Sequence, residues 1–133
     1  MPSPFPNLAP EDRGDVHVLD HTSVVLADNP LGDPARRDLF VYTPPGYADS
    51  ETPLPAVMIL PGYTGMGEKL LARGFTDVSM ATGTARMIAE GSPPFVSVIL
   101  NGMTYVLGVQ YVNSSFLGLA SHYLMAVTFF LLF

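Results

Sequence analysis

The feature that most constrains the fold is an apolar run, Leu54 to Leu60, that ends in a loop rich in proline and glycine. A nearly continuous apolar run is typical of a strand buried on both faces of a sheet. The loop reads Pro61-Gly62-Tyr63-Thr64-Gly65, and proline cannot continue a central strand. Open α/β sheets place their chemistry in such loops, at the carboxyl ends of parallel strands. The sequence therefore predicts an α/β fold with a candidate site directly after residue 60.

Hydrophobic patterning predicts further strands and two helices around this run. The strands are expected at Val16–Leu26, Leu39–Tyr42 and Phe95–Leu100, and the helices at Met66–Arg73 and Val78–Glu90. A strand, a helical segment and a second buried strand form a unit whose two strands run parallel. Because both runs are uniformly apolar, we expect Leu54–Leu60 and Phe95–Leu100 to be adjacent or near-adjacent parallel strands at the centre of one sheet.

Composition narrows the classes of function. With 133 residues the chain is expected to form one domain. Its formal net charge of −6 argues against a nucleic-acid partner, which needs a basic surface. The absence of cysteine excludes disulfides and thiolate chemistry. We predict no cofactor and no metal ion.

Two pairs of polar residues are candidates for a binding site. His17 and His21 lie four residues apart on an expected strand, which separates them by roughly 13 Å, so solvated or hydrogen-bonded histidines are favoured over a shared metal. Arg36 and Arg37 open the next strand. They could recognise an anion, but an edge-strand charge or a salt bridge to a nearby acidic residue is the favoured interpretation.

The loop after residue 60 also has the glycine spacing of a phosphate-binding loop. Gly62 and Gly67 are correctly separated, but Glu68 follows where that motif needs a lysine, and Lys69 is followed by Leu70. A carboxylate at this position would repel a phosphate. A nucleotide site is therefore not expected.

The order of several motifs resembles a known family. The stretch Arg37–Gly65 contains R-x-L-x-V-Y-x-P-P-G-Y and, after a spacer, V-x-x-L-x-G-Y-T-G, while residues Gly108–Ser114 read G-x-Q-Y-x-N-S. From about Val16 to about Leu124 the chain is similar to the opening of the esterase D-like branch of the α/β-hydrolases, which hydrolyse carboxylic esters with a serine nucleophile.

The resemblance implies the N-terminal portion of an α/β-hydrolase-like fold, with three or four strands, covering helices and an incomplete sheet. We expect a flexible arm at residues 1–14, a partial domain at residues 15–124 and an apolar tail of uncertain status at residues 125–133. No G-x-S-x-G nucleophile elbow occurs in the chain. The resemblance therefore implies a fragment of an esterase that is truncated before its nucleophile and inactive by itself. The parent family acts on small-molecule esters.

The resemblance also assigns site residues. The loop after the third strand of an α/β-hydrolase supplies a backbone N–H to the oxyanion hole. Here that donor would be the main chain of Tyr63, in a loop that is equally a plain strand-to-helix turn. Gln110, Tyr111 and Asn113 either line an acyl pocket or are structural polar residues. The resemblance assigns no residue of this chain as the serine, histidine or acid of a catalytic triad.

The C-terminal region carries no charge after Glu90. Residues 116–133 are long enough for a membrane span, but no basic residue flanks them, so truncation or an altered reading frame is favoured. The N-terminus lacks a signal-peptide pattern, so we expect a cytoplasmic protein, with membrane attachment through residues 116–133 as the alternative. An incomplete sheet is expected to self-associate through its exposed edge. The alternative functions are a non-catalytic remnant or binding module and a small membrane-attached protein.

Overall fold

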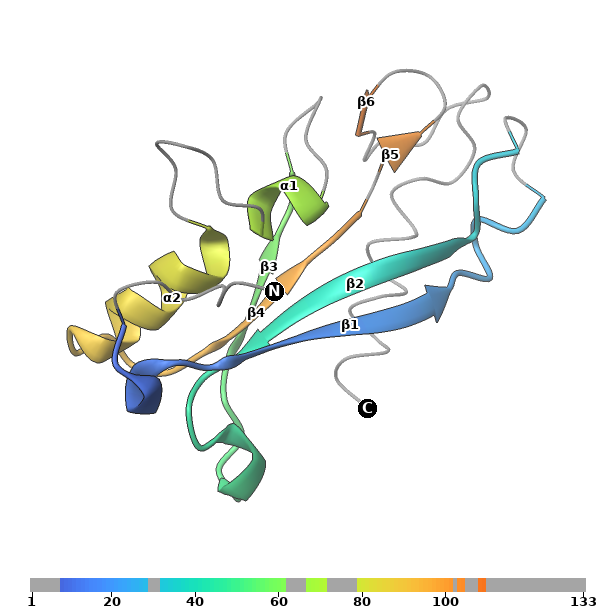
Figure 1. The fold of residues 1–133 in the computed structure, drawn as a ribbon. Helices are drawn as coiled ribbons and strands as arrows, with labels where there is room; N and C mark the ends of the chain where they lie inside the picture. Colours follow the sequence, from blue (N-terminus) through green and yellow to red (C-terminus); the bar gives the residue numbers. More distant parts are fainter. Residues whose placement is uncertain are drawn as a thin grey trace.

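The computed structural model describes residues 8–28, 32–61, 67–71, 79–101, 103–104 and 108–109. Within these ranges four strands form a mixed sheet in the order β1-β2-β4-β3 (Figure 1). The strands are β1 (Asp15–Thr22), β2 (Arg36–Thr43), β3 (Ala56–Ile59) and β4 (Val96–Ile99). β2 pairs antiparallel with β1 and with β4, whereas β3 and β4 are parallel. The predicted parallel pairing of the two apolar strands is confirmed.

Short helices and a second strand pair complete the described elements. They are the 3-10 helices η1 (Pro10–Asp12) and η2 (Tyr47–Asp49), the α-helices α1 (Gly67–Leu71) and α2 (Met80–Ala89), and the antiparallel pair β5 (Met103–Thr104) and β6 (Gly108–Val109). Both predicted helices are present between β3 and β4: α1 lies within the predicted Met66–Arg73, whose remaining residues are outside the described ranges, and α2 is shorter than the predicted Val78–Glu90.

Helix α2 begins and ends at residues suited to those positions. The Ser79 hydroxyl accepts a hydrogen bond from the Thr82 backbone N–H at 3.2 Å, which satisfies a donor that the first turn leaves open. After the helix, Gly91 has φ of 104°, a conformation that favours glycine.

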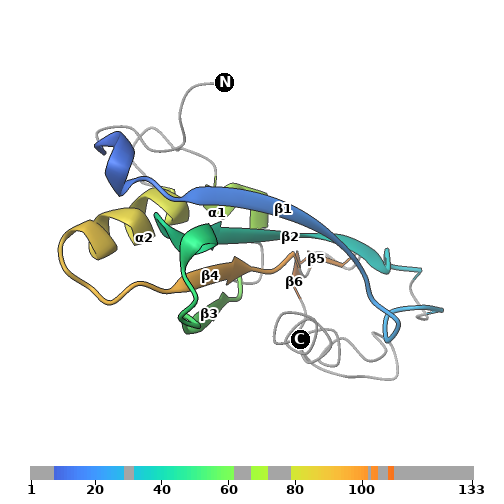
Figure 2. The same ribbon diagram turned by 90° about the horizontal axis from the view of Figure 1, so that it is seen from below.

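The two α-helices cover one face of the sheet (Figure 2). Alternate side chains of a strand share a face, so Phe40 and Tyr42 of β2 point the same way. Tyr42 is 1% exposed and packs against Ala81 and Ala85 of α2. Phe40 lies against Gly67, the first residue of α1. Burial of these rings fixes both helices on this face.

The other face of the sheet carries a second apolar layer. Leu39 packs with Leu26 and Leu100, and Val41 packs with Val98 in a neighbouring cluster. The register explains these contacts, because Val41 of β2 lies directly opposite Val98 of β4. The sheet is therefore apolar on both sides along its two inner strands, β2 and β4.

The expectation that Leu54–Leu60 is a central, fully buried strand is wrong. Among the described strands β3 pairs with β4 alone and is one of the two outer strands of the sheet. Val57 is 45% exposed and Leu60 is 43% exposed. A continuous apolar run predicts a strand that can be covered on both faces, but it does not determine which strand stands outermost. Phe95–Leu100, in contrast, contains the inner strand β4, all of whose residues are buried.

The first strand is also shorter than the predicted Val16–Leu26. β1 ends at Thr22, and the Ser23 backbone N–H donates to the Ala35 carbonyl at 2.9 Å. A turn follows, in which the Ala27 N–H donates to the Val24 carbonyl. The turn carries Leu26 into the core beside Leu39. The apolar residues after residue 22 therefore serve packing from a turn and not from a strand.

Part of the segment predicted as a flexible arm, residues 1–14, packs onto the domain. Residues 1–7 lie outside the described residues. Leu8 packs against the cluster around Tyr42, and its carbonyl accepts hydrogen bonds from the Arg13 side chain at 2.8 and 3.0 Å. Gly14 is buried against the Tyr42 ring. Residues 8–14 thus pack over one end of β2.

Candidate functional site

The carboxyl ends of the parallel strands β3 and β4 lie at the same edge of the sheet, where α/β folds carry their chemistry. β3 ends at Ile59 and is followed by the buried Pro61. Helix α1 begins at Gly67, next to this edge (Figure 1). Pro61 and Gly67 flank the predicted oxyanion loop. Both residues therefore lie near the edge of the sheet where such a loop is expected.

Gly67 fixes the start of α1 tightly against the sheet. A Cβ atom at this residue would lie 3.0 Å from the Phe40 ring and 3.3 Å from the Leu100 carbonyl oxygen. Those distances are shorter than ordinary van der Waals contact, so glycine permits a close approach here. The contact joins α1 to β2 and to the end of β4.

A buried arginine holds the turn after β4 at the same edge. Arg37 is 8% exposed. Its Nε donates to the Pro34 carbonyl at 3.0 Å, and its Nη1 donates to the Asn101 carbonyl at 3.2 Å. Because β2 runs antiparallel to β4, the start of β2 lies beside the end of β4. Arg37 therefore ties Pro34, before β2, to Asn101, two residues after β4, a role that the sequence did not reveal. The available signal was an arginine at the start of a predicted strand.

Arg36, the neighbouring cation, behaves as the favoured interpretation predicted. Its Nε donates to Asp20 Oδ2 at 2.7 Å across the β1–β2 pair. This hydrogen bond lowers the pKa of the Asp20 carboxyl below its usual value of 3.8 and raises the pKa of Arg36. Both side chains are exposed, so the pair is a surface ion pair outside the candidate site.

Ser79 and Ser97, two buried serines, have structural environments. Ser79 caps α2, and its hydroxyl also lies 3.0 Å from Thr82 Oγ1. Ser97 is buried in β4 with its hydroxyl 3.5 Å from Thr84 Oγ1. His17 Nε2 instead lies 3.2 Å from Thr43 Oγ1. None of these contacts pairs a serine hydroxyl with a histidine, as a nucleophile and its general base would be paired.

The site residues predicted from the sequence lie outside the described residues. This applies to the backbone donor of Tyr63 and to the three pocket candidates, Gln110, Tyr111 and Asn113. The structure brings together the flanks of the predicted loop, at Pro61 and Gly67, and the adjoining turn at Asn101. The four residues themselves remain predictions.

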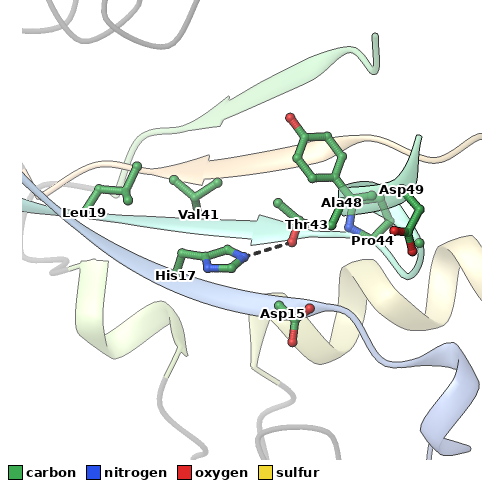
Figure 3. Close-up of a pocket in the computed structure, with 10 residues that line it drawn as sticks. Asp15, His17, Leu19, Val41, Thr43, Pro44, Ala48 and Asp49 are labelled. Atoms are coloured by element: carbon green, nitrogen blue, oxygen red, sulfur yellow. Dashed lines mark hydrogen bonds between the residues drawn. The ribbon is translucent and has the colours of Figure 1, made fainter. Parts of the chain in front are cut away.

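A cavity of about 530 Å³ lies at the other end of the sheet, away from the candidate site (Figure 3). Its lining includes His17, Thr43 and Asp49. Thr43 ends β2, and antiparallel pairing places that end beside the start of β4 and not beside its carboxyl end. The carboxyl ends of the parallel strands and the cavity thus lie at different ends of the sheet. For ester chemistry we favour the carboxyl ends, because the glycine-rich loop follows β3 there.

The described residues contain neither a metal-binding cluster nor a membrane-spanning helix. No group of three or more histidines or acidic residues in these ranges could hold a metal ion. Within the same ranges, no helix has the length and apolar character needed to cross a membrane. Residues 116–133, the segment considered as a membrane span, lie outside them.

The described sheet, with its parallel β3–β4 pair and the helices between these strands, defines a partial α/β fold. Chains of solved structures match it, among them a ferulic acid esterase with a TM-score of 0.63 over 89% of this chain. The two sequences are 14% identical, so the match concerns the fold, and this chain spans 43% of that esterase chain. No family model and no curated protein sequence matches the chain.

Proposed function

We propose that this chain provides the oxyanion loop of a serine carboxylic-ester hydrolase. The observation that carries the proposal is the position of the glycine-rich segment 61–67, which leaves β3 at the carboxyl end of a β3–β4 pair. The similarity of fold to a ferulic acid esterase supports it. In this proposal the Tyr63 backbone N–H donates to the oxygen that becomes negative during attack on the ester carbonyl.

The neighbouring contacts suit a rigid oxyanion donor. Electrostatic stabilisation of a transition state depends on donors that are in place before the reaction. Pro61 is buried, and Gly67 packs against β2 and the end of β4, so both flanks of the loop are held by the sheet. Arg37 fixes the adjacent turn through Asn101. Gln110, Tyr111 and Asn113 are proposed to line the acyl side of the same pocket, which takes a small-molecule ester.

A nucleophile has to come from outside these 133 residues, because the chain contains no G-x-S-x-G. The second oxyanion donor of an α/β-hydrolase is the residue after that serine, so it would be missing as well. We therefore propose that the chain alone does not turn over esters. Purified chain should hydrolyse short-chain p-nitrophenyl esters no faster than buffer. Turnover that a serine-directed phosphonate abolishes, with a labelled serine, would overturn this part of the proposal.

A direct test of Tyr63 uses the coding DNA read beyond the Phe133 codon in all three frames. If a product with a nucleophile elbow is encoded, Tyr63→Pro removes the proposed N–H donor and Tyr63→Phe retains it. Loss of one oxyanion donor costs about 10²–10³-fold in kcat. We expect that loss for Tyr63→Pro with little change in KM, and near-normal kcat for Tyr63→Phe. An unchanged kcat in a folded Tyr63→Pro variant would refute the role of Tyr63.

The second candidate is a non-catalytic binding module on the same partial fold. The structural environments of Ser79 and Ser97 favour it, together with the absence of an elbow motif in the sequence. If no frame encodes a nucleophile elbow and the chain shows no turnover, the binding module replaces the esterase proposal.

A further inference from the structure

The cavity at the far end of the sheet has the character of a separate small-molecule site (Figure 3). It lies between β1, β2 and η2 and has a volume of about 530 Å³. Small-molecule pockets in proteins span about 300–1,000 Å³ and are mostly apolar with a few polar groups. Its lining includes Leu19 and Val41, which lie on the face of the sheet opposite α1 and α2, and Pro44, which follows β2. Such walls suit the apolar body of an organic ligand.

The charged residues of the cavity all have the same sign. Asp15 lies opposite Thr43 in the strand register, and Asp49 ends the η2 turn that follows β2. Both residues line the cavity, and the described lining contains neither lysine nor arginine. The chain as a whole has a formal net charge of −6, which adds to the attraction of cations and the repulsion of anions.

Two further groups favour a cation over a neutral ligand. Tyr47 lines the cavity and offers an aromatic ring, whose face attracts cations. His17 and Thr43 are already joined by a contact of 3.2 Å between Nε2 and Oγ1. This contact uses part of the hydrogen-bonding capacity of both groups, whereas Asp15 and Asp49 are exposed and their carboxylates are accessible to a ligand.

We propose that this cavity binds a small organic ammonium ion that has an apolar body. The ammonium group lies near the carboxylates of Asp15 and Asp49, and the apolar body lies against Leu19 and Val41. This site goes beyond the proposed esterase function. It lies at the opposite end of the sheet from the oxyanion loop, and its charge disfavours carboxylate products of ester hydrolysis.

The test compares three probes of similar shape and different charge with the full 133-residue chain. They are the 2-phenylethylammonium ion, neutral 2-phenylethanol and anionic 3-phenylpropanoate, followed by ligand-detected NMR and titration calorimetry. We expect millimolar binding of the ammonium ion, weaker binding of the alcohol and no binding of the carboxylate. Equal binding of ammonium and alcohol, or no binding of the ammonium ion, would refute the proposal.

Variants locate the bound ion. Asp15→Asn and Asp49→Asn change exposed residues, and each should weaken ammonium binding by about two- to fivefold, as expected for a solvent-exposed ion pair. Asp38→Asn is the matched control, since Asp38 is an exposed carboxylate of β2 whose position in the strand faces the helix side. Ala48→Phe, at an exposed lining residue, should block the cavity for every probe. Wild-type affinity in the Asp15/Asp49 double variant, or an equal loss in Asp38→Asn, would place the ion elsewhere.

Discussion

Replacing Gly14 by alanine should be among the most destabilising single-methyl changes in this domain. A Cβ atom there would lie 2.0 Å from the Thr43 carbonyl oxygen and 2.6 Å from the Tyr42 ring. The φ angle of Gly14 is not in the left-handed region, so the cost is steric and not conformational. Because the closest atom belongs to the backbone of β2, rotation of a side chain cannot relieve the contact.

The expected magnitude follows from measured effects of overpacking. Adding a carbon to a filled core typically costs about 1–3 kcal/mol. Since β1 or the η1 segment must move away from β2, we expect the upper end of that range for Gly14→Ala. With a urea m-value near 2 kcal/mol/M, a loss of about 3 kcal/mol lowers the unfolding midpoint by roughly 1.5 M.

The assay is urea unfolding followed by far-UV circular dichroism at low protein concentration, with Gly83→Ala as the matched control. Gly83 lies inside α2, and a Cβ there would meet no atom within 4 Å. Alanine is favoured over glycine inside a helix by about 0.5–1 kcal/mol, so this variant should raise the midpoint. If Gly14→Ala unfolds at the wild-type midpoint, the packing of residues 8–14 on Tyr42 is refuted.

Three further predictions concern titration and association. Burial raises the pKa of the Tyr42 phenol to about 12, with the Asp15 charge as a further cause. The unfolded chain therefore releases this proton at a lower pH than the folded chain, and the free energy of unfolding should fall between about pH 10 and pH 12. A spectrophotometric titration should show a late phenol that Tyr42→Phe lacks, and a normal titration of all tyrosines would contradict this prediction. The hydrogen bond from Arg36 holds the pKa of the Asp20 carboxyl below 3.8. The small stabilising contribution of this ion pair is therefore present above pH 3.8 and is lost as the pH falls through the lowered pKa of Asp20 in the folded chain. NMR titration should show the Asp20 pKa returning towards 3.8 in Arg36→Gln, and an unchanged titration curve would exclude Arg36 as the cause. The outer strands β1 and β3 carry exposed valines, Val18 at 59% and Val57 at 45% exposure. We therefore expect the chain to self-associate through these strands at micromolar concentration. Light scattering after size-exclusion chromatography measures this association, and a monodisperse monomer would refute the prediction.

The sequence alone determined which segments become regular structure around the candidate site. The apolar runs at Leu54–Leu60 and Phe95–Leu100 predicted two parallel neighbours, and β3 and β4 are paired in this way. Hydrophobic patterning predicted a helix at Val78–Glu90, and α2 begins and ends within two residues of those limits. These predictions succeeded because hydrophobic period, helix caps and breaking residues act over a few neighbouring positions. The assignments of Tyr63, Gln110, Tyr111 and Asn113 remain predictions from resemblance.

Tertiary structure alone decided the order of the strands and the contacts between distant segments. The outer position of β3, the end of β1 at Thr22 and the cover formed by Gly14 over Tyr42 each depend on which strand lies beside which. Arg37 reaches Asn101 because an antiparallel β2 brings its own start to the end of β4. The cavity beside Asp49 exists because the turn after β2 folds back next to β1. A local pattern carries no information on these pairings, since the same apolar run can stand inside a sheet or at its edge.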